Sequence, residues 1–326
     1  MVTLKEIASR SGVSISTVSY YLNKKITLPQ NTAERIETAL KELDYQPKRI
    51  TKKKQEQRLV GVIIPDIENP YYATLVKKLE LALIRYRYSL ILSNTDYSYD
   101  LEYNFIEVLK KKEVNGVILS PANSLPRKKK VNLDIPLVLL DEKIENIKSS
   151  CFTIDNFKGG YIATNFLIQK GLRKIVFLRG THGTWGSIER FEGYTKAHQE
   201  NAIPIDDSLV IDGNFNFSGG YNAITQLLQT NKKFDAIFAA NDFSAVGAIE
   251  SLKKEGIAIP EEVSIIGFDD IWLASMITPK LTTIKQPLDQ ICQKAVDTLI
   301  RTIEDPSIIV YETFEPQLII RDSCKP

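Results

Sequence analysis

Three polar side chains stand directly after short apolar runs, where they could bind a hydroxylated ligand. Asp141 ends the run LVLLD, Asp269 ends SIIGFD, and Asn241 follows AIFAA. Such runs are typical of buried parallel strands, and open α/β sheets bind ligands at the carboxyl ends of their strands. Two carboxylates facing one cleft accept hydrogen bonds from vicinal sugar hydroxyls, and an amide both donates and accepts them. Helix capping or surface ion pairing would explain the same carboxylates, so both interpretations stay open at this point.

The residue patterns of common enzymes are missing from the sequence. The two histidines, His182 and His198, lack the spacing of a zinc site such as H-E-x-x-H. There is no G-x-S-x-G elbow, no GxxxxGK[ST] loop, and no G-x-G-x-x-G motif after the first expected strand. Paired carboxylates can hydrolyse glycosides, but we expect Asp141 and Asp269 on opposite lobes of a hinged cleft. The sequence therefore predicts a binding protein without a metal or cofactor rather than an enzyme.

Apolar runs and amphipathic stretches alternate from Leu59 onward, and this alternation predicts the layers that hold the polar side chains. The runs expected to be parallel strands are 59–64, 88–94, 115–120, 135–141, 174–180, 208–213, 236–242 and 263–270. Amphipathic helices are expected between them, for example over 71–86 and 99–114. Two such series predict a body of two doubly wound parallel-sheet α/β subdomains.

The first 45 residues carry a different pattern, that of three short helices. Gly12 suits a tight turn between the first two helices, and Ser14 or Ser16 can cap the second. Val13 can fill the corner between them. The apolar faces are supplied by Leu4, Ile7 and Ala8, by Val18 and Leu22, and, in a third helix near 31–43, by Ile36, Ala39, Leu40 and Leu43. Two short helices joined by a glycine turn predict an all-α helix-turn-helix head that reads the major groove of DNA.

Positive charge is concentrated near the N-terminus. Residues 1–58 carry 12 Lys or Arg against 6 Asp or Glu, whereas the other 268 residues carry 30 against 34. This asymmetry predicts a polyanionic partner for the head alone, unless the charge is only a solvated tail. Residues 48–58, KRITKKKQEQR, hold six of the bases, and we expect a linker that becomes helical when DNA phosphates neutralise it. A plain basic linker is the alternative.

The remaining features predict a cytoplasmic protein. The first 30 residues hold no apolar signal segment, and no stretch approaches 18 apolar residues. The three cysteines, Cys151, Cys292 and Cys324, are far apart and have no ligand spacing, so we expect reduced thiols.

The head and body together resemble the LacI/GalR family of transcription regulators. The head pattern is carried by Thr3, Leu4, Glu6, Ile7, Ala8, Ser11, Gly12, Val13, Ser14, Thr17, Val18, Ser19, Leu22 and Asn23. In the body, IIPDIENPYY, ILSNTDYS, RFEGY, AANDFSAVGA, VSIIGFDD and LTTIKQP look like family landmarks, so the resemblance covers residues 2–323. It implies a periplasmic-binding-protein-like body. The divisions expected are a head at 1–46, a hinge at 47–58 and a body at 59–326, with an N-subdomain (59–156 and 286–313) and a C-subdomain (157–284 and 314–326).

The resemblance also implies which residues touch DNA. These are Thr3, Ser14, Ile15, Ser16, Thr17, Ser19, Tyr20, Asn23, Thr32 and Tyr45 in the head, and Lys48, Arg49, Lys52, Lys53 and Lys54 in the hinge. Tyr20 stands where some relatives have an arginine that pairs with guanine, so their half-site cannot be copied to this chain. Lys54 stands where the family usually has a leucine wedge. We therefore expect weaker DNA bending and stronger salt dependence than in leucine-bearing relatives.

The family's effector site maps onto a second set of residues. Arg190 matches the effector-binding arginine, and its rigid fork suits a diol, carbonyl or carboxylate. Tyr72 and Phe215 match aromatic positions that stack on a sugar or a purine. Together with Asp141, Asn241 and Asp269 they predict a neutral polyhydroxylated effector. Trp185 and Trp272 are further candidates for the cleft wall, and Asp242 is a second-rank candidate that more often supports the following helix.

The family implies an assembly and a mode of regulation as well. We expect a homodimer on a pseudo-palindromic operator, repressing a carbohydrate-utilisation operon, with a small sugar as effector. The stripe of Tyr72, Leu75, Leu79 and Ala82 is expected to contribute to the dimer interface, although half of it must be core. A regulator tuned by a phosphorylated carrier protein, and a repressor responsive to purines or nucleosides, stay open as alternatives.

Overall fold

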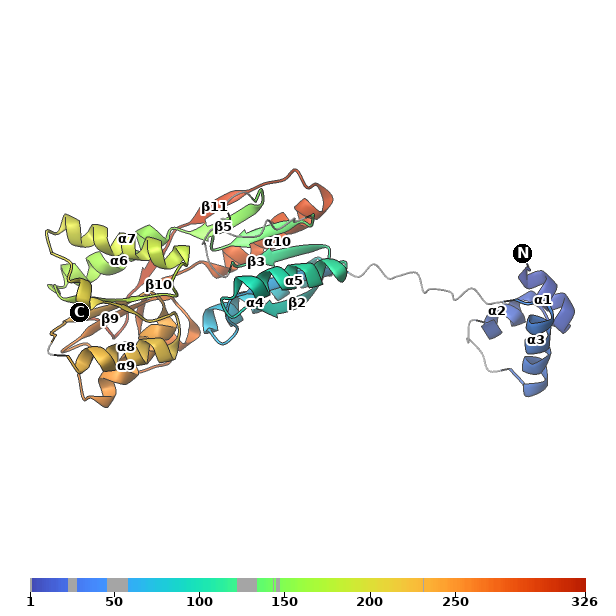
Figure 1. Cartoon of the computed structure of the whole chain (residues 1–326), viewed down its shortest axis with the longest axis horizontal. Coiled ribbons are helices and arrows are strands. Elements are labelled where there is room, and N and C mark those ends of the chain that lie inside the picture. The colour runs from blue at the N-terminus through green and yellow to red at the C-terminus, as the bar shows by residue number, and fades with distance from the viewer. Residues whose placement is uncertain are drawn as a thin grey trace. The chain divides into compact units, whose positions relative to one another are not determined.

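The chain divides into two compact units, residues 1–57 and 58–326, and each is described by itself (Figure 1). The computed structural model describes residues 2–22, 28–45, 58–121, 134–142, 144, 147–230 and 232–326. Six of the predicted DNA contacts lie outside the described residues and stay predictions: Asn23, Lys48, Arg49, Lys52, Lys53 and Lys54.

The head is a helix-turn-helix followed by a third helix, as predicted. Its helices are α1 (Leu4–Ser11), α2 (Ile15–Leu22) and α3 (Gln30–Glu42). Thr3 and Glu6 form a reciprocal capping box at the start of α1, and Gly12 ends the helix with φ of 64°. The Ser14 hydroxyl accepts the Thr17 amide at 3.0 Å, so Ser14 rather than Ser16 caps α2. Buried apolar side chains from all three helices close a small core: Ile7, Ala8, Val18, Ile36 and Ala39.

The first lobe of the body is built on a six-stranded sheet in the order β11-β5-β4-β3-β1-β2, and every pairing in it is parallel. Its strands are β1 (Leu59–Ile64), β2 (Ser89–Asn94), β3 (Gly116–Leu119), β4 (Leu137–Leu140), β5 (Ser150–Ile154) and β11 (Tyr311–Phe314). Helices α4 (Pro70–Arg85) and α10 (Leu288–Glu304) pack on one face, whereas α5 (Tyr99–Lys111) packs on the other. Alternate residues of β1 follow this division, since Val62 belongs to the core with α4 and Ile63 to the core with α5.

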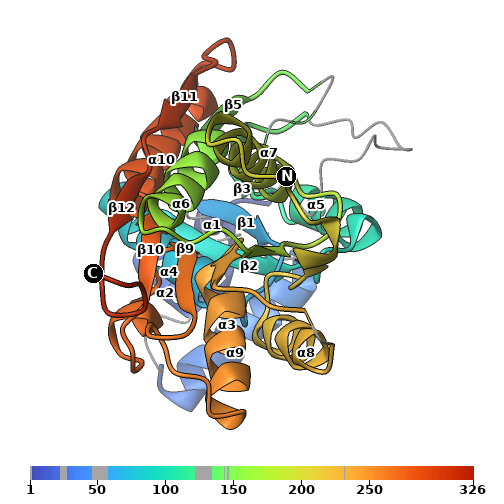
Figure 2. The same ribbon diagram turned by 90° about the vertical axis from the view of Figure 1, so that its left-hand side faces the viewer.

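The second lobe repeats the plan with the strand order β12-β10-β9-β8-β6-β7. Its strands are β6 (Ile175–Arg179), β7 (Val210–Asp212), β8 (Ala236–Ala239), β9 (Ser264–Asp269), β10 (Thr282–Lys285) and β12 (Gln317–Ile319). The helices α6 (Asn156–Gln169) and α7 (Trp185–Glu200) cover one face, and α8 (Phe217–Leu228) and α9 (Asp242–Lys254) cover the other (Figures 1 and 2). Two short 3-10 turns, η1 (Asp207–Leu209) and η2 (Trp272–Ser275), complete the lobe. The prediction of two doubly wound sheets is confirmed.

The chain passes three times between the two lobes. β5 lies in the first sheet and is followed by α6 of the second lobe, and β10 of the second sheet is followed by α10 on the first. The third passage joins β11 to β12. Three neighbouring connections allow the lobes to rotate against each other about a hinge.

Two expectations from the sequence need correction. β5, β10, β11 and β12 were not among the predicted strands, because polar residues interrupt their apolar sequence. In addition, β12 pairs antiparallel with β10. The prediction that an apolar stripe on α4 contributes to the dimer interface is also wrong. Its members Leu75, Leu79 and Ala82 are buried in the first lobe's core, and Tyr72 packs against that core. The large apolar residues of α4 that are exposed are Leu81 and Ile84.

Candidate functional site

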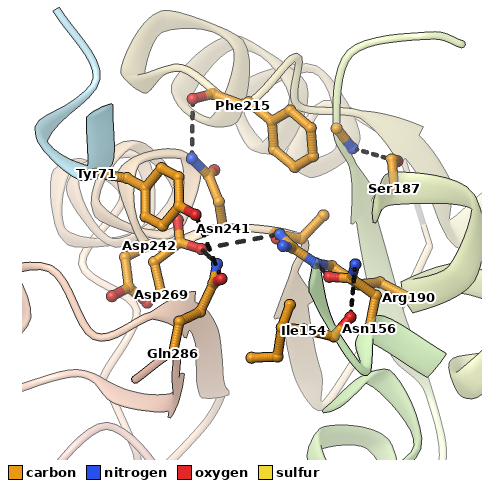
Figure 3. Close-up of polar contacts among 12 residues, drawn as sticks. Tyr71, Ile154, Asn156, Ser187, Arg190, Phe215, Asn241, Asp242, Asp269 and Gln286 are labelled. Carbon is orange, nitrogen blue, oxygen red and sulfur yellow. Dashed lines mark hydrogen bonds and ion pairs between the residues drawn. The ribbon is translucent and has the colours of Figure 1, made fainter. Parts of the chain in front are cut away.

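One cavity between the two lobes is lined by all six predicted effector residues. Figure 3 shows four of them, Arg190, Phe215, Asn241 and Asp269, with their polar neighbours. They are Tyr72, Asp141, Arg190, Phe215, Asn241 and Asp269. The two carboxylates come from different lobes, since Asp141 follows β4 and Asp269 ends β9. The strands of both sheets thus deliver polar side chains at their carboxyl ends, which is where α/β sheets bind ligands.

Asp141 is half-buried and lies in a network of hydroxyl groups. Its Oδ1 accepts a hydrogen bond from Tyr71 Oη at 2.9 Å, and its Oδ2 accepts one from Ser120 Oγ. Burial raises the pKa of Asp141, and the hydrogen bonds from Ser120 and Tyr71 oppose that rise. The carboxylate is therefore held in one orientation by donors from its own lobe, with an edge on the cavity.

Asp269 occupies the facing position on the second lobe. Gln286 Nε2 donates to its Oδ1 at 2.8 Å, and Arg190 Nη1 lies 3.9 Å from the same oxygen. Burial raises the pKa of Asp269 to about 7, although the nearby guanidinium and the Gln286 hydrogen bond lower it. The charge of Asp269 is thus sensitive to pH near neutrality.

Arg190 is fixed more tightly than a surface arginine. Its Nε donates to Asn156 Oδ1 at 2.9 Å, and its Nη1 donates to the Ala240 carbonyl at 2.5 Å. The guanidinium lies 3.6 Å from the centre of the Phe268 ring, a close cation–π contact. α7 comes close to α6 because Gly160 leaves room for the Arg190 backbone, where an added Cβ would meet the Arg190 carbonyl oxygen at 2.2 Å. These contacts orient the guanidinium group of Arg190 before any ligand binds.

The remaining predicted residues have mixed roles. Asn241 caps α9 through Ser244 and donates from Nδ2 to the Phe215 carbonyl at 3.0 Å, so its amide also orders the cleft wall. The Phe215 ring lies over Gly180, where a Cβ would meet ring atoms. Asp242 is not among the cavity-lining residues. Its carboxylate accepts from Thr283 Oγ1 and from the Ile271 amide, which secures the corner between β9 and β10.

The backbone at the cavity is strained at several non-glycine positions. The φ angles are 54° at Tyr97, 67° at Asp141, 56° at Phe215 and 116° at Asp269. Such conformations cost about 1–3 kcal/mol each and persist where the surrounding structure requires them, commonly at ligand sites. All four residues line the same cavity, which marks it as the functional part of the body.

Among the cavity residues that were not predicted from the sequence are Tyr71, Tyr97, Asn156 and Gln286. Tyr71 neighbours the predicted Tyr72, and its hydroxyl joins Asp141 to Gln286. The Tyr97 hydroxyl is buried and has no hydrogen-bond partner in the described part of the chain. Asn156 and Gln286 lie where the chain passes between lobes, so a search for polar residues at the passages would have found them.

Direct contacts already join the lobes across the cleft. Glu142, next to Asp141, is buried, and its Oε1 accepts the backbone amide of Trp185 at 2.8 Å. Glu142 therefore caps the N-terminus of α7 from the other lobe. The N-cap residue of α7 itself, Thr184, makes no side-chain capping hydrogen bond. The prediction that Trp185 and Trp272 form the cleft wall is not supported, because neither lines the cavity and their side chains are 48% and 56% exposed. Both rings face solvent.

The head presents its predicted DNA contacts on the surface of α2 and its flanks. Ile15 and Tyr20 are 48% and 47% exposed, so both large side chains are accessible to a partner. Ser14 and Ser16 are exposed, whereas Thr17, Ser19, Thr32 and Tyr45 are half-buried. The Thr3 hydroxyl donates to Glu6 and the hydroxyls of Ser14 and Thr17 bond to each other, so part of this polar set stabilises the helices themselves.

Two further properties bear on the class of protein. The described residues hold no group of three or more His, Cys, Asp or Glu side chains that could ligate a metal. Among the described helices, none combines the length and apolar character needed to cross a membrane.

Family comparisons agree with both units of the chain. Residues 3–48 match the family model described as bacterial regulatory proteins, lacI family, and residues 57–316 match the periplasmic binding proteins and sugar binding domain of LacI family. The chain is 34% identical to the HTH-type transcriptional regulator RegA of Clostridium saccharobutylicum, over 98% of both chains. It is 33% identical to the ribose operon repressor of Escherichia coli K12, over 94% of this chain and 95% of the relative.

Solved structures give the same result. A LacI family transcriptional regulator from Enterococcus faecium with bound ribose is 30% identical to this chain, with a TM-score of 0.74. The match covers 82% of this chain and 99% of the E. faecium chain. The transcriptional regulator CelR in complex with cellobiose is 27% identical, with a TM-score of 0.73. That match covers 99% of this chain and 100% of the CelR chain. Because both family models and full-length relatives match, this chain belongs to the LacI family of bacterial DNA-binding transcription regulators.

Proposed function

We propose that this regulator represses a carbohydrate-utilisation operon and that a small neutral sugar, bound between its lobes, changes its affinity for the operator. The observation that carries the proposal is the convergence on one cavity of Asp141 from the first lobe and of Arg190 and Asp269 from the second. A ligand held by all three side chains contacts both lobes at once. Its binding energy therefore depends on the angle between them.

The chemistry of the cavity favours a polyhydroxylated molecule. Asp141 and Asp269 can accept hydrogen bonds from hydroxyls, and Arg190 can donate to a ring or carbonyl oxygen. The ring faces of Phe215 and Tyr72 offer apolar surface to the C–H side of a sugar. Each of the two acids, when ionised, disfavours a phosphate group by like-charge repulsion. Relatives described as ribose operon repressors, and the ribose-bound neighbour from E. faecium, support a pentose as the first ligand to test.

The cavity must enlarge to admit such a ligand. It encloses about 50 Å³ here, whereas small-molecule sites usually enclose about 300–1,000 Å³. Glu142 and Trp185 hold the lobes together across the cleft, and Asn69 Nδ2 lies 3.5 Å from the Phe215 carbonyl. Entry of a sugar requires these contacts to open or rearrange. The regulator then has two states with different lobe angles, and a ligand that prefers one state shifts the population.

In the proposed mechanism, the head reads DNA as one half of a homodimer. Two copies of α2 on a two-fold axis would read half-sites about one helical turn apart, which implies a pseudo-palindromic operator. Ile15, Ser16 and Tyr20 are the proposed base-reading side chains. Sedimentation velocity tests the dimer, since a monomer at micromolar concentration would contradict it.

Titration calorimetry of the full-length protein tests the proposed effector class. Pentoses, hexoses, disaccharides, nucleosides and purine bases are compared, with Arg190→Ala as the cleft variant and Arg301→Ala, an exposed arginine on α10, as its matched control. We expect a neutral sugar to bind the unaltered protein and the Arg301→Ala variant equally, and Arg190→Ala to bind it about ten- to hundredfold more weakly. Binding of a purine in place of every sugar would overturn the sugar assignment. Binding of none of them would favour regulation by a partner protein.

A further inference from the structure

A second cavity lies at the end of the second lobe opposite the effector cleft. It encloses about 390 Å³, within the range of small-molecule sites. Its lining includes Arg173, Lys174 and Ile175 at the amino end of β6, and Lys232 and Lys233 shortly before β8. The effector cleft lies at the carboxyl ends of these strands. The two cavities are thus at opposite ends of one sheet.

The rim of this distal cavity carries more positive than negative charge, since Arg173, Lys174, Lys232 and Lys233 line it and Asp206 is the acid on the lining. Within the described residues, Lys174, Lys232 and Lys233 form no ion pair. The acid on the lining, Asp206, accepts the Ser208 amide and hydroxyl. Asp235, beside the rim, accepts the backbone amides of Arg173 and Lys174. Hydrogen bonds from Ser208, and after them the charge of Lys232, lower the pKa of Asp206, so this acid partly balances Lys232. The four cations still outnumber the two acids and can attract an anion.

The floor of the cavity has a different character from its rim. Ile175, Ile203 and Leu209 supply apolar surface. His198, which is only 2% exposed, donates from Nδ1 to the Tyr194 carbonyl at 3.0 Å. Its other ring nitrogen, Nε2, has no hydrogen-bond partner among the described residues and can accept from a hydroxyl. Burial lowers the pKa of His198, which keeps the ring neutral and Nε2 available as an acceptor.

We propose that the distal cavity binds a small hydroxylated phosphate ester. The lysine ammonium groups suit the phosphate oxygens, His198 Nε2 suits a hydroxyl, and the apolar floor suits the carbon skeleton. The site is separate from the effector cleft. His198 lies eight residues beyond Arg190 on α7, a rise of about 12 Å along the helix axis.

Calorimetry at fixed ionic strength, with D-ribose 5-phosphate, inorganic phosphate and D-ribose as probes, tests this site. The test variant is Lys232→Gln/Lys233→Gln, and the control is Lys111→Gln/Lys112→Gln, which removes the same charge from exposed positions on the first lobe. We expect D-ribose 5-phosphate to bind the test variant at least about tenfold more weakly than the unaltered protein, the control and Arg190→Ala. Inorganic phosphate, which lacks the skeleton and the sugar hydroxyls, should bind at least about tenfold more weakly than the ester.

Four results would overturn the assignment. These are no binding of D-ribose 5-phosphate at about 10 mM, equal binding by all variants, loss of binding in Arg190→Ala, and equal affinity for inorganic phosphate. D-ribose reports on the effector cleft independently of the distal cavity. Its binding, lost only in Arg190→Ala, would therefore leave the proposed function intact even if the phosphate site failed.

Discussion

The effector cleft and the DNA-reading surface recognise their ligands by opposite physical means. In the cleft, the polar side chains are buried and already hydrogen-bonded, as Arg190 is to Asn156 and the Ala240 carbonyl. On the head, Ile15 and Tyr20 are about half exposed and rest on a small core. The cleft gains selectivity from fixed geometry, at a cost in backbone strain and raised pKa values. The head depends on exposed groups and on positive charge, and salt screens the latter.

Removal of Arg190 should give the largest change in affinity. It should weaken sugar binding in the cleft much more than operator binding by the head. The Arg190→Ala change leaves Asn156 and Asp269 without their buried partner and removes the donor for the sugar. We expect sugar affinity to fall about ten- to hundredfold, as measured by calorimetry. Operator affinity without sugar should change less than sugar affinity. An equal loss of both would mean that Arg190 is needed for the fold.

The Gly12→Ala change should damage the head alone. An alanine at φ of 64° is strained by about 1–2 kcal/mol, and its Cβ would lie 2.4 Å from Arg35 Nη2. We expect operator affinity, measured by fluorescence anisotropy, to fall while sugar affinity stays unchanged. Gly171→Ala is the matched control, because Gly171 also has positive φ, at 83°, but lies in the body with open space around it. Equal loss of operator binding in the control would contradict this account.

The raised pKa of Asp269 should make the stability of the body depend on pH. Between its ordinary value of 3.8 and about 7, the folded state holds a proton that the unfolded state has released. The free energy of unfolding should therefore fall as the pH rises through this window and level off above it. Asp141 and Asp242 also have raised pKa values, so Asp269→Asn should flatten the profile without abolishing it. Urea denaturation at a series of pH values measures this, and an unchanged slope in the variant would contradict it.

The smallest effect concerns the hinge. Lys54→Leu removes one cation and supplies the wedge that related regulators carry. We expect a larger DNA bend in a circular-permutation assay. The slope of the logarithm of operator affinity against the logarithm of salt concentration should become shallower by about 1. A full family-like bend with Lys54 in place would contradict the hypothesis.

The sequence predicted the architecture because the strongest signals were long and periodic. The head helices and the buried strands, from LVGVII to SIIGFD, each have a clear spacing or apolar run. β10 and β12 do not, because edge and hinge strands such as TTIK and QLI are short and partly polar. In the site, Arg190 was found only through the resemblance to a family. Gln286 and Asn156 were missed because their importance comes from the passages between lobes, which bring distant segments together.

In the proposed function, a sugar in the cleft controls the affinity of the head for DNA. The most direct test is fluorescence anisotropy of the full-length protein on a duplex selected from a random library, with and without the best-binding sugar. We expect the sugar to change the duplex Kd at least about tenfold in the unaltered protein and to leave it nearly constant in Arg190→Ala. An unchanged Kd in the unaltered protein, with the sugar shown to be bound, would contradict the claim.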